Sequence, residues 1–160
     1  MARAPAIAAS FIATVILGSC AALGPPQLVR DELGLFSPEA RSEAEDRLRD
    51  LAAEAGIWVF VVSDAEADPP RMLDAPMGEA DDAGVPGVAV LFGPETLVGS
   101  GRSERANESF SSLDFLAADQ TFQAGDADRA LELAVDLVED WVQRGMPRDN
   151  EERPFQPGPS

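Results

Sequence analysis

The spacing of apolar residues predicts a first helix from about residue 38 to residue 55. Ser37-Pro38-Glu39 places a serine at the N-cap, a proline at the first helical position and an acid in the first turn. Gly56, a residue type common just past helix ends, follows the expected last turn. Small and aliphatic residues recur at helical spacing in between, at Ala40, Ala44, Leu48, Leu51, Ala52 and Ala55.

Two uninterrupted apolar runs predict two buried strands. Residues 57–62 read IWVFVV and residues 87–92 read GVAVLF, with no polar residue in either run. Runs of β-branched and aromatic residues of this length are typical of strands that are covered on both faces. Gly93-Pro94-Glu95 then predicts a turn, and residues 96–98 predict a short third strand that pairs with the second.

The C-terminal part of the pattern predicts helices. Asp126 is an expected N-cap, and Gly145 and Pro147 are expected to end the last helix. Apolar side chains form a broad stripe between them, at Ala127, Ala130, Leu131, Ala134, Leu137, Val138, Trp141 and Val142. The weaker pattern between residues 103 and 122 indicates a further short helix. Together the elements predict an α/β sandwich, a small and mostly parallel sheet with helices on both faces.

The apolar N-terminal segment and the single cysteine, Cys20, indicate an exported protein. Leu17-Gly18-Ser19-Cys20 resembles the lipobox of bacterial lipoproteins, in which the cysteine thiol receives a diacylglyceryl group. Two alternatives stay open. No charge occurs between Arg3 and Arg30, so an uncleaved transmembrane anchor fits, and so does an ordinary secretory signal. The lipoprotein interpretation anchors the chain in the cell envelope, on the periplasmic side of a bacterial membrane.

These signals divide the chain into four parts. Residues 1–19 are the expected signal peptide or anchor, and residues 20–30, with Gly24-Pro25-Pro26, are the expected tether. Residues 31–144 suffice for one domain with one core. Residues 145–160 are rich in proline and contain one aromatic residue, so they predict a disordered tail.

The composition excludes several kinds of chemistry. The chain has a net charge of −17 and contains no histidine, and all its basic residues are arginines. Neither a Ser-His-Asp triad nor catalysis by a lysine can therefore operate. Such an acidic protein repels nucleic acid and anionic lipids, so we expect no nucleic-acid partner and a preference for cations or basic protein surfaces.

In its order of motifs the chain resembles the TPM domain, a family of bacterial envelope and thylakoid-lumen proteins. The resemblance spans about residues 29–142. Its opening motif resembles VRDELGLFSPEAR, through Asp31 and Ser37, and its first strand resembles AGIWVFVVSD. The family's glycine-led strand resembles GVAVLF, its glycine motif resembles Val98-Gly99-Ser100-Gly101, and its final Gly-Asp resembles Gly125-Asp126.

The resemblance implies two functions. Thylakoid relatives suggest an accessory role on a membrane protein complex, whereas metal binding and a plant acid phosphatase activity are associated with other members. Two departures bear on any family site. The segment between the first two predicted strands is short and broken by prolines where the family has a helix, and the predicted hairpin is short and lacks the usual basic residues.

Asp64, Asp81 and Asp82 are the candidate ligands of a divalent cation, calcium or magnesium. Asp64-Ala-Glu66-Ala-Asp68 matches the first three ligand positions of a calcium loop, but Pro69 replaces the required glycine and Ala75 replaces the final glutamate. In a looser site, Asp64 must lie close to Asp81 and Asp82. Asp64 follows the first predicted strand, whereas the other two acids precede the second. Parallel strands place these acids at opposite ends of the sheet, so solvated loop acids and no cofactor are the favoured interpretation.

Gly99, Gly101 and Arg102 are the second candidate site. Gly99-Ser100-Gly101-Arg102 follows a predicted strand, the setting of a phosphate-binding turn at a helix start. Glu104 stands where the dinucleotide fingerprint has its third glycine, which favours a tight turn without a ligand.

The sequence therefore favours a membrane-anchored accessory protein without a catalytic residue over an enzyme. A phosphatase built from carboxylates alone needs a metal, because the carboxylates otherwise repel phosphate. A metal-dependent acid phosphatase of the TPM type stays the alternative.

Overall fold

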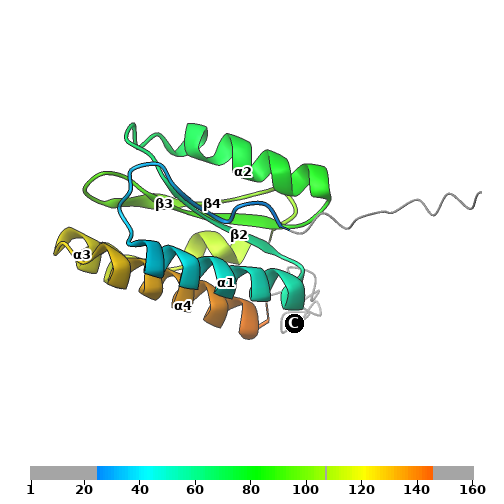
Figure 1. Cartoon of the computed structure of the whole chain (residues 1–160). Helices are drawn as coiled ribbons and strands as arrows, with labels where there is room; N and C mark the ends of the chain where they lie inside the picture. Colours follow the sequence, from blue (N-terminus) through cyan, green and yellow to red (C-terminus); the bar gives the residue numbers. More distant parts are fainter. Residues whose placement is uncertain (1–24, 107, 146–160) are drawn as a thin grey trace, which may run out of the picture.

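A four-stranded sheet lies at the centre of the computed structural model, which describes residues 25–106 and 108–145 (Figure 1). Strands β1 (Val29–Asp31), β2 (Trp58–Ser63), β3 (Gly87–Phe92) and β4 (Leu97–Arg102) follow one another in this order across the sheet. The first three are parallel, and β4 pairs antiparallel with β3. The prediction of a mostly parallel α/β sheet is confirmed.

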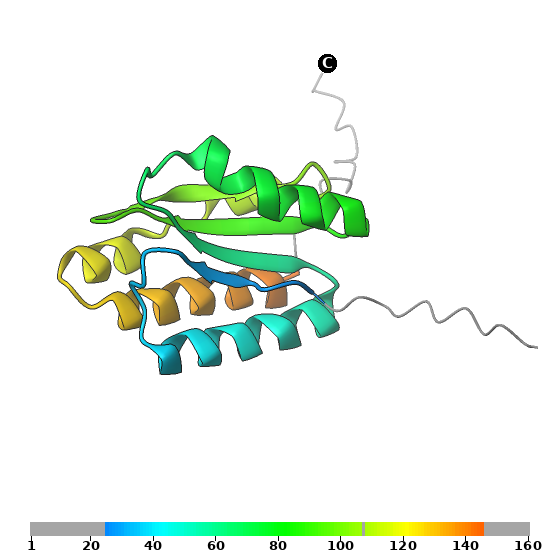
Figure 2. The same ribbon diagram turned by 45° about the horizontal axis from the view of Figure 1, so that its top comes forward.

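Helices cover both faces of this sheet. Helix α2 (Pro69–Ala83) lies on one face, and α1 (Pro38–Ala55), α3 (Leu116–Gln123) and α4 (Ala127–Gln143) lie on the other (Figures 1 and 2). A short 3₁₀ helix, η1 (Glu108–Ser112), connects β4 to α3. The expected sandwich of helix, sheet and helix is therefore present.

The predicted ends of α1 and α4 agree with the structure. The Ser37 hydroxyl accepts a hydrogen bond from the Ala40 N–H and begins α1, and Gly56 ends it in the left-handed conformation, with φ 68°. The Asp126 carboxylate caps α4 by accepting from the Arg129 N–H. Each cap satisfies a backbone group that the helix leaves without a partner.

The core lies between the sheet and the helices. Strands β2 and β3 are buried along nearly their whole length, as their apolar runs predict. Trp141 of α4 is buried against Phe110, with ring centroids 5.1 Å apart. Burying a large apolar side chain contributes about 1.5–3 kcal/mol, so these layers supply most of the favourable free energy.

The tether interpretation is wrong for residues 28–30. Leu28 is fully buried, Val29 is 3% exposed, and both belong to the core. Val29, Arg30 and Asp31 pair in register with residues 61–63 of β2. The folded domain thus begins before residue 31, because an edge strand of three residues suffices to cover the side of β2.

The proline-broken segment between β2 and β3 is a helix, contrary to the departure noted in the sequence. Prolines occupy the first turn of α2, where no backbone donor is needed, and Pro76 lies inside the helix. The cost of an internal proline is about 3 kcal/mol. Met72, Met77 and Ala80 are buried on the sheet side of α2, and their burial offsets that cost.

The third strand predicted from the sequence is β4. It is longer than predicted and runs to Arg102 instead of ending at residue 98. Position 101 of β4 requires glycine. A Cβ atom at Gly101 would overlap the side chain of Leu73, which packs from α2 onto β4. Gly101 therefore permits close packing of α2 on the strand, whereas Gly99 adopts a positive φ of 151° that favours glycine.

Candidate functional site

The three candidate metal ligands do not lie at one place. Asp64 follows β2 and its carboxylate accepts a hydrogen bond from the Glu66 N–H at 2.8 Å. Asp81 and Asp82 lie in the last turn of α2, at the other end of a helix of 15 residues, which is about 22 Å long. Within the described ranges no group of three acids or other metal-binding residues could hold an ion.

The candidate phosphate-binding turn is part of a strand. Gly99, Gly101 and Arg102 belong to β4, and residues 103–106, which follow the strand directly, form no helix. The Arg102 guanidinium donates to the carbonyl oxygen of Ala106 at 2.9 Å, so it holds the loop that follows the strand. The turn interpretation is wrong because backbone pairing with β3 and the contact with Leu73 use this segment.

Cys20 lies outside the described residues, as do all but the first residue of the predicted tail. The structure therefore places neither the lipidation site nor the tail. Among the helices that the structure does describe, none is long and apolar enough to cross a membrane.

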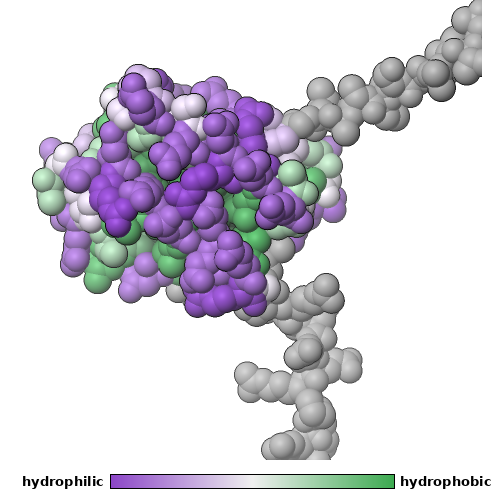
Figure 3. Space-filling view, turned by 60° about the horizontal axis from the view of Figure 1, so that its bottom comes forward, coloured by the Kyte–Doolittle hydropathy of each residue, from purple (hydrophilic) through white to green (hydrophobic). Residues whose placement is uncertain are grey.

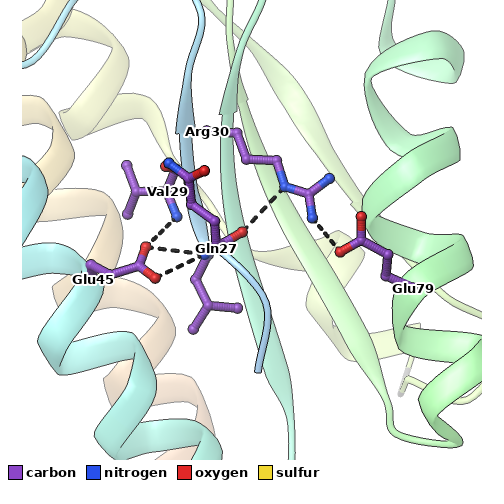
Figure 4. A network of polar contacts seen from close by, with 6 residues as sticks. Gln27, Val29, Arg30, Glu45 and Glu79 are labelled. Carbon is purple, nitrogen blue, oxygen red and sulfur yellow. Dashed lines mark hydrogen bonds and ion pairs between the residues drawn. The ribbon is translucent and has the colours of Figure 1, made fainter. Parts of the chain in front are cut away.

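Strand β1 is held in place by side chains on both sides of the sheet (Figure 4). The Glu45 carboxylate, from α1, accepts hydrogen bonds from the Leu28 N–H at 3.0 Å and the Val29 N–H. The Gln27 side-chain amide donates to the Val29 carbonyl oxygen at 3.0 Å. Arg30 forms an ion pair with Glu79 of α2 and lies 5.1 Å from the centre of the Phe60 ring. These contacts close the outer edge of the sheet at β1.

Most arginines of the described part serve to neutralise local acids. Arg47 bridges α1 and α4, and its guanidinium contacts Glu139 and Asp136 at 2.6 Å each. These bonds, first of all that with Glu139, raise the pKa of Arg47. Further ion pairs join arginines to neighbouring acids, namely Arg30–Glu79, Arg49–Glu45, Arg71–Glu66, Arg129–Glu132 and Arg144–Asp140.

Acids without such a partner gather along α1. We call them the acidic stripe, which consists of Glu39, Glu43, Asp46, Asp50 and Glu54. Their spacing of three or four residues places them on one side of the helix, and all are exposed. Within residues 25–106 and 108–145 no arginine forms an ion pair with them. Like charges at this spacing destabilise a helix, so the stripe is not explained by the stability of α1.

A groove runs beside the acidic stripe, between α1 and α4. The two helices lie side by side and run in the same direction (Figure 2), and the Ser37 N–H donates to the Asp128 carboxylate at 2.8 Å. The groove has a volume of about 380 Å³, and its polar lining comes mainly from Glu39, Glu43, Arg47, Asp128, Arg129 and Glu132. Figure 3 shows that hydrophilic side chains dominate this face of the molecule. The arrangement offers an open, negatively charged surface.

Comparison with known proteins identifies no relative. No family model, no curated protein and no solved structure matches the chain. The TPM resemblance therefore stays a prediction.

The acidic stripe is visible in the sequence, although it forms no recognised motif. Its signal is the recurrence of acids at positions 39, 43, 46, 50 and 54, which repeats at helical spacing opposite the apolar positions of the same helix. The groove could not be predicted, because it depends on the packing of α1 against α4, which are about 90 residues apart in the chain.

Proposed function

We propose that the protein is a membrane-anchored, extracytoplasmic accessory protein that binds a basic surface of a membrane protein complex through the acidic stripe. The observation that supports this proposal is the stripe itself, a row of exposed acids that form no ion pair within the described residues, in a chain of net charge −17. Complementary charges accelerate encounter and select partners, whereas like charges repel the wrong ones. A partner that presents arginine or lysine side chains along a helix or strand fits this surface.

The surface suits binding better than catalysis. The arginines near the groove are committed to acids of α4, and Arg47 contacts two of them. An anionic substrate would meet uncompensated carboxylates along α1, which repel it. A basic protein segment meets the same carboxylates as attractive partners, and its binding removes the mutual repulsion of the stripe.

The test compares two variants with equal charge. The stripe variant carries Glu39→Gln, Glu43→Gln, Asp46→Asn and Asp50→Asn. The control variant carries Asp74→Asn, Asp82→Asn, Glu95→Gln and Glu104→Gln, which neutralises exposed acids on other parts of the surface. Each full chain is expressed with its own N-terminal segment, and its co-migration with membrane complexes is measured after mild detergent extraction.

We expect wild type and the control variant to co-migrate with one complex and the stripe variant to migrate alone. Raised salt should release wild type, because exposed charges are screened. Equal co-migration of both variants would contradict the proposed function. Thermal unfolding of both variants checks that each is folded, and removal of repelling charges should leave the stripe variant at least as stable as wild type.

A further inference from the structure

The two edge strands of the sheet, β1 and β4, differ in how their outward backbone groups are bonded. This difference is independent of the proposed function. At β1 the outward N–H and carbonyl groups of Val29 are occupied by Glu45 and Gln27. Such blocking is a common way in which proteins prevent the edge of a sheet from pairing with another chain. β4 is the other edge of the sheet.

The register of β3 and β4 shows which groups of β4 point outward. Ser103 donates its N–H to the Gly87 carbonyl oxygen at 2.8 Å, and Val90 lies opposite Ser100. Hydrogen-bonded and non-bonded pairs alternate along an antiparallel ladder, so Gly101 bonds toward β3 and Ser100 presents its N–H and carbonyl oxygen away from β3. Among the described residues, no hydrogen bond to these outward groups of Ser100 is found.

The open part of β4 differs from the rest of the surface in charge. Residues 96–103 contain no acid, in a chain of net charge −17. The first residue of the strand, Leu97, is tied to Asp119 of α3 by its N–H. Residues 98–101, between Leu97 and Arg102, carry no charge, so two such acidic molecules can approach one another there with little repulsion.

An exposed apolar side chain lies near the same edge. Leu116 is the large hydrophobic residue of the described part that is exposed, with an exposed fraction of 55%. It lies one turn before Asp119 in α3, so the two side chains share one side of the helix, the side that contacts the start of β4. An unpaired strand edge offers backbone groups to another chain, and the same contact can bury an apolar side chain that lies beside it.

We propose that two copies of this protein pair through their β4 edges, antiparallel and centred on Ser100. Each Ser100 N–H donates to the Ser100 carbonyl oxygen of the other copy, which makes the contact self-complementary, as a two-fold axis requires. The two sheets join into one continuous sheet, and Leu116 of each copy lies at the margin of the contact. A second copy fits better than a basic partner, because this strip offers backbone groups and an apolar side chain instead of negative charge.

The experiment measures the mass of the detergent-solubilised full chain by sedimentation equilibrium, over a range of protein concentration. Wild type should shift from one to two protomers as concentration rises. Ser100→Pro removes the outward N–H and no donor to β3, so it should stay at one protomer, whereas Ser100→Ala keeps that donor and should behave as wild type. Leu116→Glu changes an exposed residue and should also shift the equilibrium toward one protomer.

Three results would overturn the proposal. They are a single-protomer mass for wild type at every concentration, an unchanged two-protomer mass for folded Ser100→Pro, and an unchanged two-protomer mass for Leu116→Glu. If circular dichroism shows that Ser100→Pro does not fold, Leu116→Glu decides alone. The effect of salt concentration distinguishes this contact from the proposed function. Screening should favour the dimer of acidic protomers, whereas it should weaken binding to a basic partner. The stripe variant should still dimerise.

Discussion

The carboxylate of Asp119 accepts a hydrogen bond from the backbone N–H of Leu97, 22 residues earlier in the chain, at 2.8 Å. It also accepts from the Thr96 hydroxyl and the Gln123 amide, each at 2.8 Å. Burial alone would raise the pKa of Asp119, but these hydrogen bonds favour the charged form and lower the pKa from its ordinary value. One side chain of α3 thus fixes where β4 begins.

Asp119→Ala should destabilise the protein in a pH-dependent way. Loss of hydrogen bonds to a charged acceptor costs about 1.5–3 kcal/mol at neutral pH. The pKa of Asp119 is lower in the folded state, so its contribution is present above the pKa of the unfolded chain and is lost as the pH falls through the folded value. Urea unfolding should show that the difference from wild type shrinks in acid. Asp50→Ala, in the acidic stripe, is the control, and a difference that does not change with pH would contradict the assignment.

Glu45→Ala should loosen β1. The change leaves the N–H groups of Leu28 and Val29 without their acceptor, and each such loss costs about 1–3 kcal/mol when the group stays buried. We expect faster amide hydrogen exchange at both residues and a lower free energy of unfolding. Glu54→Ala, on the exposed side of α1, should leave both unchanged. If Glu45→Ala exchanges as slowly as wild type, the carboxylate does not hold the edge.

Gly101→Ala should destabilise the protein because the new methyl group meets Leu73. Overpacking of a well-packed site costs about 1–3 kcal/mol. Shortening the neighbour should relieve the overlap, so the double variant Gly101→Ala with Leu73→Ala should lose less stability than the two single variants together. Strict additivity of the three free energies, from urea unfolding, would show that α2 does not pack on β4 at this point.

The sequence predicted those elements whose signals are local. The ends of α1 depend on Ser37, Pro38 and Gly56, and β2 and β3 on unbroken apolar runs, all of which are visible within a few residues. The missed features depend on distant partners. Val29 is a strand residue because Glu45 and Gln27 bind its backbone while β2 binds the neighbouring Leu28 carbonyl oxygen. The prolines of α2 are tolerated because the helix packs on the sheet.

The candidate site was harder to predict for a related reason. Gly99 and Gly101 suggest a ligand-binding turn when read alone, and only the position of Leu73 shows why the strand contains Gly101. The acidic stripe needs no distant information, since the phase of α1 follows from its apolar residues. The groove beside it needs the contact between Arg47 and α4.

Cys20→Ser should abolish lipid attachment if the lipoprotein prediction holds. A thioether-linked diacylglyceryl group needs the cysteine sulfur, and a buried acyl chain contributes about 0.8 kcal/mol per CH₂ to membrane binding. Mass spectrometry of the mature N-terminus should show a lipidated Cys20 in wild type and none in the variant. An intact Met1 peptide in the membrane fraction would support the uncleaved anchor instead, and an unmodified mature N-terminus outside the membrane would support ordinary secretion.

Calcium and magnesium should not stabilise the protein beyond general screening. Asp64 lies at one end of α2 and Asp81 and Asp82 at the other, so the three carboxylates cannot share one ion. Specific binding to the native state alone would raise its stability by about 2.7 kcal/mol at a hundredfold excess of ion over Kd. Melting temperatures are compared in calcium, magnesium and sodium chloride at equal ionic strength, for wild type and Asp82→Asn. We expect both proteins to respond alike to each salt. A rise that is specific to calcium or magnesium and disappears in Asp82→Asn would contradict the separation of the acids and make a metal-dependent phosphatase assay the next experiment.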